Sequence, residues 1–264
     1  MPDIEPQQSI IPDPELQGYE RPYHWFLPRD SIWTRIHDAY VARAVQLVAE
    51  SGARRVLEVG CGDGWNCQLL HVAGLDVTGV DWSARGIALA RCLVPGAHFA
   101  VGDLRESGVR SQLRPPFDAI LMVEVIEHIP PSDSAAALRT LHDYLRPDGV
   151  IVLTTPSENW PNTNPRHFRH FTPESLESLV SEAGGYSILS MEGYGDVRIT
   201  RRFSRLRPIV DNRFFRLKPV LSRMLDRAER ASRCTDPAYS MGLVAVLQAV
   251  NTDGGNEIDM RESL

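Results

Sequence analysis

The sequence predicts an α/β fold in which a parallel sheet carries helices on both faces. Two observations lead to this prediction. Short apolar runs of strand length alternate with segments of helical periodicity from about residue 53 onward, and glycine or acidic residues follow several of these runs. Strands joined by helix-length connections pair in parallel, and a parallel sheet is covered on each face. The 264 residues allow one such domain with an added segment.

The individual elements follow from periodicity and from turn residues. Residues 34–51 place apolar side chains at helical spacing and stop at Gly52. Phe117–Val123 and Val150–Thr154 are continuous apolar runs, which are typical of strands buried on both faces. The other expected strands are Arg55–Gly60, Asp76–Val80 and Ala97–Val101. The other expected helices are Trp65–Val72, Ala84–Leu93, Ser134–Leu145 and Pro173–Ala183.

Composition excludes several classes of protein. The four cysteines form no C-x-x-C pair, which argues against a structural zinc site and indicates a reduced compartment. The N-terminus lacks a basic region and an apolar core, so it does not read as a secretory signal. No apolar run reaches the roughly 20 residues of a transmembrane helix. The net charge of −6 makes nucleic acid a less favoured partner. We therefore expect a cytoplasmic protein without a transmembrane segment.

The chain divides by composition into five parts. Residues 1–17 are rich in proline and acidic residues and read as a disordered leader. Residues 18–52 are aromatic and then helical, and they form an N-terminal cap. The main domain is expected over 53–250, with an arginine-rich helical insert at 196–238. Residues 251–264 are polar and read as a flexible tail.

Three alternating glycines follow the first strand of the main domain. Gly60, Gly62 and Gly64 let the backbone turn sharply and approach a ligand, and the amides of the next helix point at that ligand. A dinucleotide-binding loop would place its third glycine one residue later, where this chain has Trp65. Glu58 would repel a pyrophosphate and suits a cationic ligand such as a sulfonium with an α-amino group. The loop therefore favours a cationic ligand over a dinucleotide.

Carboxylates end the next two expected strands. Asp81 can accept both hydroxyls of a ribose, and Asp103 is placed to meet an adenine amine. Together with the glycine loop and the stretches Phe117–Ile120 and Leu145–Val150, they resemble successive motifs of class I S-adenosylmethionine-dependent methyltransferases. The resemblance covers about residues 50–192.

The resemblance implies a Rossmann-like sheet of seven strands, mostly parallel, with an antiparallel last strand. Tyr186–Met191 and Met241–Val250 are then the sixth and seventh strands, with the helical insert between them. It also implies S-adenosylmethionine as the cofactor. The cofactor-binding residues that it implies are Glu58, Gly60, Cys61, Gly62, Gly64, Asp81, Trp82, Asp103, Leu104 and Glu124.

The loops after the fourth and fifth strands carry the candidate acceptor-side residues. If the first loop forms a helical turn, Glu124, Glu127 and His128 share one face. His167 and His170 come from the second loop, which leaves the same sheet edge. The pattern is similar to ubiquinone-biosynthesis O-methyltransferases and small-RNA 3′-terminal 2′-O-methyltransferases. These imply Mg²⁺ or Mn²⁺ bound by Glu124, Glu127, His128 and His167, since His167 matches the later histidine better than His170.

Two metal-free alternatives stay open for the same residues. His128 or His167 could act as a general base, which is typically worth about 10²–10⁴-fold in rate; Glu127 is the third candidate catalytic residue. The loops could instead be structural, with Thr172 capping the helix that starts at Pro173.

Chemistry favours oxygen as the methylated atom. An acceptor hydroxyl needs activation, which this carboxylate–histidine set could supply, whereas nitrogen acceptors need less. The expected acceptor is a hydroxyl on a small molecule or sugar, including a vicinal diol. The alternatives are an RNA 3′-terminal ribose and a lipid- or phosphate-linked acceptor at a membrane. A non-catalytic binding protein and a nicotinamide dehydrogenase are the rivals from other classes.

The arginine-rich insert has three interpretations. It is an amphipathic lid with solvated arginines, a surface for a phosphate-bearing acceptor, or an interfacial helix peripheral to an anionic membrane. Its arginines are Arg198, Arg201, Arg202, Arg205, Arg207, Arg213, Arg216, Arg223, Arg227, Arg230 and Arg233. The aromatic run of the cap reads as a packed element, with Tyr19, Tyr23 and His24 as its candidate acceptor contacts.

Overall fold

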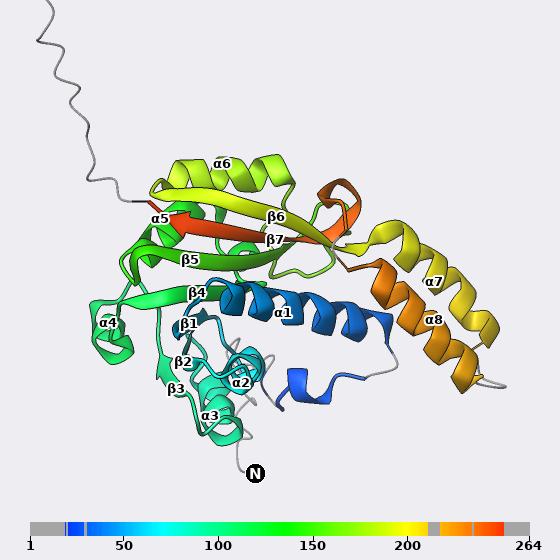
Figure 1. The fold of residues 1–264 in the computed structure, drawn as a ribbon, viewed down its shortest axis with the longest axis horizontal. Helices are drawn as coiled ribbons and strands as arrows, with labels where there is room; N and C mark the ends of the chain where they lie inside the picture. The colour runs from blue at the N-terminus through cyan, green and yellow to red at the C-terminus, as the bar shows by residue number, and fades with distance from the viewer. Residues whose placement is uncertain (1–18, 20, 29–30, 211–216, 234, 251–264) are drawn as a thin grey trace, which may run out of the picture.

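The computed structural model describes residues 19, 21–28, 31–210, 217–233 and 235–250. Its centre is a seven-stranded sheet with the strand order β3-β2-β1-β4-β5-β7-β6 (Figure 1). The strands are β1 (Arg55–Val59), β2 (Asp76–Asp81), β3 (His98–Val101), β4 (Phe117–Val123), β5 (Leu145–Pro156), β6 (Tyr186–Asp196) and β7 (Ser240–Ala249).

The strand directions confirm the predicted sheet. Strands β1 to β5 pair in parallel with one another, whereas β7 runs antiparallel to both β5 and β6. The antiparallel strand spans Ser240–Ala249, one residue earlier than the expected Met241–Val250. Because β7 reverses direction between its two neighbours, β6 runs parallel to β5. The carboxyl ends of six strands therefore meet at one edge of the sheet, where ligands of such sheets bind.

Helices cover both faces of the sheet and close one hydrophobic core on each. The core on one face contains side chains of α1, α2, α3 and α8, and the core on the other face contains those of α4, α5 and α6. The helices are α1 (Ile32–Glu50), α2 (Trp65–Val72), α3 (Ala84–Leu93), α4 (Ser107–Leu113), α5 (Pro131–His142), α6 (Pro173–Ala183), α7 (Val197–Val210) and α8 (Lys218–Ala231).

Some boundaries differ from the sequence-based expectation. The helix expected at Ser134–Leu145 begins at Pro131, because proline fits the first turn of a helix, and ends at His142. Leu145 instead starts β5, where it pairs with Phe117 of β4. The short helix α4 was not expected. Strands β5 and β6 each extend beyond their apolar runs, to Pro156 and Asp196.

The arginine-rich insert forms a helical hairpin. Its two helices, α7 and α8, lie side by side and extend away from the sheet (Figure 1). The leader at 1–17 and the tail at 251–264 lie outside the described residues. Within the described part of the chain, no helix combines the length and the apolar character that crossing a membrane requires.

Candidate active site

The glycine loop after β1 packs too tightly to accept side chains. Gly60 and Gly64 have φ angles of +73° and +81°, which favour glycine. A Cβ on Gly60 would lie 2.5 Å from a methyl carbon of Val125, and one on Gly64 would lie 2.9 Å from the Cβ of Ala90. The loop backbone therefore lies directly against the segment after β4 and against α3. Approach of this backbone to a ligand stays a prediction.

Asp81 at the end of β2 presents a fixed carboxylate beside this loop. Its Oδ2 accepts a hydrogen bond of 2.9 Å from the amide of Gly62, and its Oδ1 accepts one of 2.8 Å from the amide of Ser83. Burial raises the pKa of Asp81, while these two hydrogen bonds act in the opposite direction. Each carboxylate oxygen keeps a second lone pair, so the group can also accept two hydroxyl hydrogens from the adjoining cavity.

A cavity of about 290 Å³ lies beyond Asp81. The carboxylate of Asp103 borders it and forms a bidentate ion pair with Arg105, which lowers the pKa of Asp103. Much of the remaining wall is apolar, and apolar walls suit a flat aromatic ring, although Arg105, His128, Asp133 and Thr140 also border the cavity. The predicted cofactor residues that line the cavity are Gly60, Asp81, Trp82, Asp103 and Leu104, together with the apolar residues Val59, Val80, Met122, Val125 and Ile129.

Glu58 and Cys61 lie just before and just after Gly60, and both are close to the thiol of Cys67 in α2. The buried side chain of Glu58 faces α2, where its Oε2 accepts a hydrogen bond of 2.7 Å from the thiol of Cys67. Burial raises the pKa of Glu58 to about 8. Cys61 borders a second, larger cavity. Direct contact between Glu58 and a cationic ligand stays a prediction, because the described hydrogen bond of the Glu58 side chain is made to Cys67 of α2.

The larger cavity, of about 780 Å³, adjoins the glycine loop at Gly60 and Cys61 and is bordered by the predicted acceptor-side residues Glu124 and His128. A smaller one of about 220 Å³ shares part of its lining, including Glu124 and Tyr40. Aromatic and imidazole side chains from the cap and from α1 form part of the wall, namely Tyr19, Tyr23, His24, Trp33, His37 and Tyr40. The three cap residues named as candidate acceptor contacts thus line this cavity.

The cap is attached to the glycine loop through Asp63, a residue that the sequence reasoning missed. Asp63 is completely buried, and its carboxylate accepts a hydrogen bond from the His24 amide and lies 3.1 Å from the His24 ring nitrogen Nδ1. The indole of Trp25 donates to the Asp63 carbonyl. These partners lie almost 40 positions away, and no local pattern indicates the pairing.

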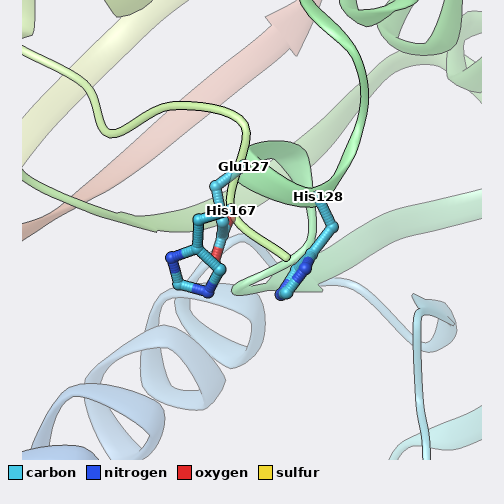
Figure 2. A group of neighbouring side chains, drawn as sticks. All are labelled: Glu127, His128 and His167. Atoms are coloured by element: carbon cyan, nitrogen blue, oxygen red, sulfur yellow. The ribbon is translucent and has the colours of Figure 1, made fainter. Parts of the chain in front are cut away.

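Three predicted acceptor-side residues converge in space. One ligand atom each from Glu127, His128 and His167 lies within 4.8 Å of the others (Figure 2). Glu127 and His128 belong to a 3₁₀ turn, Ile126–His128, that follows β4, whereas His167 comes from the loop between β5 and α6. The two loops therefore meet at the same sheet edge, as their positions after neighbouring strands suggested.

The hydrogen-bond network determines which ring nitrogens face the group. The Nδ1 of His128 lies 3.2 Å from the carbonyl oxygen of Arg166, so it must carry the proton. His170 likewise donates from Nδ1 to the carbonyl of Trp160, which leaves its Nε2 as an acceptor for the Nδ1 proton of His167. The Nε2 atoms of His128 and His167 therefore both keep a lone pair. His170 orients His167 from behind.

Glu124 occupies a different position from the one expected. Its φ of +53° lies in the left-handed region, so it precedes the 3₁₀ turn and does not share a helical face with Glu127 and His128. The helical turn over 124–128 that a shared face would require does not form, because the Glu124 amide pairs with the carbonyl of Thr154 in β5. Its Oε1 accepts a hydrogen bond of 2.6 Å from the hydroxyl of Tyr194. Its side chain nevertheless borders both acceptor-side cavities.

The electrostatics of the group favour neutral imidazoles beside a buried carboxyl group. Burial and the neighbouring histidines lower the pKa of His167 to about 4, and burial also lowers the pKa of His128. Burial and the proximity of Glu124 raise the pKa of Glu127. The Oε2 of Glu127 accepts from Thr155, whereas its Oε1 has no partner in the described part of the chain. An unpaired buried oxygen is costly, at about 1–3 kcal/mol.

Comparison with known proteins identifies the family. The family described as "Methyltransferase domain" matches residues 33–190, which is more than half of the chain. The chain belongs to this family. Its glycine loop, strand-end carboxylates and sheet order are those expected of the class I fold of S-adenosylmethionine-dependent methyltransferases.

Individual relatives agree with this assignment. The chain is 26% identical over 155 residues to the ubiquinone biosynthesis O-methyltransferase of Pseudomonas aeruginosa (strain UCBPP-PA14). The match covers 57% of this chain and 66% of the relative, so the chain spans just under two thirds of that relative's length. A SAM-dependent methyltransferase from Archaeoglobus fulgidus has a TM-score of 0.56 at 18% identity, with 80% and 93% of the chains covered. The small RNA methyltransferase HEN1 has a TM-score of 0.57 at 18% identity, with 82% and 25% covered. The two structures support the fold alone.

Proposed function

We propose that this methyltransferase methylates a hydroxyl oxygen of a small molecule or sugar, and that Glu127, His128 and His167 act on the acceptor. The observation that carries the proposal is that one ligand atom each from Glu127, His128 and His167 lies within 4.8 Å of the others, in a group where the Oε1 of Glu127 has no hydrogen-bond partner among the described residues. S-adenosylmethionine supplies a methyl group on a sulfonium, whose S–C bond breaks as the bond to the acceptor oxygen forms. The acceptor hydroxyl must lose its proton, and the three side chains are arranged for that step.

The donor set fits a divalent cation. In metal sites, a ligating histidine usually donates its other ring N–H to a carbonyl or another acceptor, and both histidines here do so. The mixture of imidazole nitrogen and carboxylate oxygen favours Mn²⁺ over Mg²⁺, which prefers oxygen ligands. Glu127, His128 and His167 would hold the ion, and Glu124 is the candidate fourth ligand. A bound cation would lower the pKa of an acceptor hydroxyl.

A metal-free base is the second candidate for the same step. His128 is the better placed of the two histidines, because it borders both the cofactor-side and the acceptor-side cavity. His167 is the weaker candidate, since a group with a pKa of about 4 is a poor proton acceptor near neutral pH. The unpaired oxygen of Glu127 has no role in this version, so the geometry supports the metal-assisted version better.

The acceptor-side cavity favours a small, polar acceptor. Its volume of about 780 Å³ is typical of small-molecule sites. Aromatic walls and the polar side chains of Asn164, His37 and Arg166 suit a ring that carries several hydroxyls. A vicinal diol on a sugar or catechol meets both requirements. An RNA 3′-terminal ribose also offers such a diol, and the likeness to HEN1 keeps it as the alternative.

The first experiment is a calorimetric titration of Mn²⁺ into protein saturated with S-adenosylhomocysteine. Wild type should show one site, which Glu127→Gln and His167→Ala weaken at least about tenfold. The matched control is His98→Ala, which removes an exposed histidine of β3. A wild type without a site would reject the metal-assisted version and leave His128 as the base. Saturation with S-adenosylhomocysteine, measured beforehand, tests the cofactor assignment separately.

A screen of acceptors then tests whether the methylated atom is a hydroxyl oxygen or an amine nitrogen. Sugars and catechols with vicinal hydroxyls are incubated with labelled S-adenosylmethionine, beside matched compounds that carry a single hydroxyl or an amine. Transfer to vicinal diols that Glu127→Gln reduces at least about tenfold would support the proposal. Transfer to amines alone, unaffected by Glu127→Gln, would contradict it.

A further inference from the structure

The α7–α8 hairpin projects from the same sheet edge as the active site. Strand β6 runs parallel to β5, so its end at Asp196 lies at the edge where β1, β2 and β4 present the cofactor and acceptor residues. Helix α7 begins at the next residue, Val197, and the hairpin extends outward from there (Figure 1). Tyr194, two residues before this end, lines an acceptor-side cavity. The hairpin thus stands beside the acceptor-side opening.

The base of the hairpin is attached to the domain. Val197 of α7 and Leu225 and Ala228 of α8 are buried, and they join the core formed by α1 and the sheet. Asp226 and Glu229 of α8 form ion pairs with Arg35 of α1. Both apolar packing and ion pairs therefore fix the orientation of the hairpin relative to the active site.

The hairpin concentrates positive charge. Residues 197–231 contain eleven basic and three acidic residues, in a chain whose net charge is −6. Two of the acidic residues, Asp226 and Glu229, are the ones that pair with Arg35 on the domain side. Helix α7 carries five arginines and no acidic residue. The outward-facing charge is therefore almost entirely positive and includes the exposed side chains Arg201, Arg202 and Arg205.

The distal end of the hairpin exposes aliphatic side chains among these charges. Leu206 and Ile209, near the end of α7, are 50% and 64% exposed. Leu217 and Val220, near the start of α8, are 47% and 41% exposed. The four residues flank the same inter-helix connection, so they lie at one end of the hairpin. Neighbouring exposed aliphatic residues mark an interaction surface more often than scattered ones do.

We propose that the distal end of the hairpin docks on an anionic membrane surface. Aliphatic side chains that enter the headgroup region, flanked by arginines that pair with lipid phosphates, are the features of an interfacial amphipathic element. A nucleic acid would use the arginines but would leave the aliphatic residues in water, because contact with its phosphate backbone depends on charge. Docking would hold the acceptor-side opening next to the lipid surface. The inference does not depend on the metal or on the methylated atom.

Vesicle flotation tests the proposal with the full chain. Wild type should bind vesicles of phosphatidylcholine mixed with phosphatidylglycerol, should not bind phosphatidylcholine alone, and should dissociate at high salt. The double variant Leu206→Ser/Ile209→Ser and the triple variant Arg201→Gln/Arg202→Gln/Arg205→Gln should each bind at least about tenfold more weakly.

Matched variants elsewhere on the surface serve as controls. Val72→Ser/Leu189→Ser removes two exposed aliphatic residues from the domain, and Arg54→Gln removes an exposed arginine. Both should bind vesicles like wild type, and all variants should bind S-adenosylhomocysteine equally well. Absence of wild-type binding, equal binding to neutral vesicles, or normal binding by the Leu206/Ile209 variant would overturn the proposal. Tighter binding to single-stranded RNA that this variant leaves unchanged would also overturn it.

Discussion

The hydrogen-bond chain behind His167 makes a specific prediction about His170. His170 is buried, and its ring is fixed by donation from Nδ1 to the carbonyl of Trp160. Its Nε2 then accepts the Nδ1 proton of His167 over 3.0 Å. The substitution His170→Ala removes this acceptor. His167 would then be free to place its proton on Nε2, the atom that otherwise faces Glu127 and His128.

The expected magnitude follows from this single contact. Partners that orient a metal-ligating histidine are worth about 10–100-fold in metal affinity. The contact here joins two neutral rings, and a water molecule could replace part of it. We therefore expect His170→Ala to weaken Mn²⁺ binding by about tenfold, or about 1.4 kcal/mol. His167→Ala removes a ligand and should cost more than that.

Two measurements check the prediction. Calorimetry gives the Mn²⁺ affinity of wild type, His170→Ala and His167→Ala. Nitrogen NMR of the metal-free protein reports the tautomer, which should be protonated on Nδ1 for His167 in wild type and mixed in His170→Ala. His170→Asn, whose amide oxygen can accept the same proton, is the conservative control and should retain more affinity than the alanine variant.

The outcome that would refute the reasoning is equally specific. A wild-type His167 protonated on Nε2 would show that the proposed hydrogen-bond direction is wrong. Loss of metal binding in His170→Ala as complete as in His167→Ala would make His170 a ligand rather than an orienting residue.

Three further predictions follow from single contacts. Asp81→Ala should weaken S-adenosylhomocysteine binding by about 10–100-fold in calorimetry, since hydrogen bonds to a charged group are worth about 1.5–3 kcal/mol; unchanged affinity would remove Asp81 from the cofactor site. Gly64→Ala, at φ +81°, should lower the free energy of unfolding by about 1–3 kcal/mol in thermal unfolding. Gly74 also has a positive φ but open space around it, so Gly74→Ala measures the cost of the backbone conformation without a steric clash. Without cofactor, the folded state holds a proton on Glu58 up to a pKa of about 8, against 4.5 for the ordinary group. The free energy of unfolding should therefore fall as the pH rises from about 4.5 to 8, by up to a few kcal/mol, and Glu58→Gln should reduce this dependence on pH. Denaturant titrations at several pH values measure it, and an equal pH dependence in wild type and Glu58→Gln would contradict the burial of this carboxyl group.

Much of the fold could be predicted because its signals are local. The apolar runs of β1, β4 and β5 and the helical periodicity of α2, α3 and α6 lie in short windows, and α2, α3, α6 and β4 were predicted to the residue. The helix α4 has no comparable apolar run. The limits of α5 and β5 depended on a partner, since Leu145 becomes a strand residue only because Phe117 lies opposite it.

The candidate site divides in the same way. The glycine spacing and the strand-end carboxylates indicated the cofactor chemistry, and the spacing of Glu127, His128 and His167 indicated a group that the structure brings together. The helical turn over 124–128 does not form, because the amide of Glu124, whose φ is +53°, pairs with the carbonyl of Thr154 in β5. That long-range pairing has no signature within the loop itself.

The sequence by itself determined the class of enzyme, because the cofactor motif depends on backbone conformation and on charges at fixed positions after strands. Only the tertiary structure decided how the acceptor side is arranged. Proton positions on His128 and His167 follow from carbonyl and imidazole partners in other loops, and the contact of Tyr194 with Glu124 spans 70 positions. The orientation of the arginine-rich hairpin likewise depends on ion pairs to α1. Such contacts form only once the chain is folded, since they join residues that no sequence window contains together.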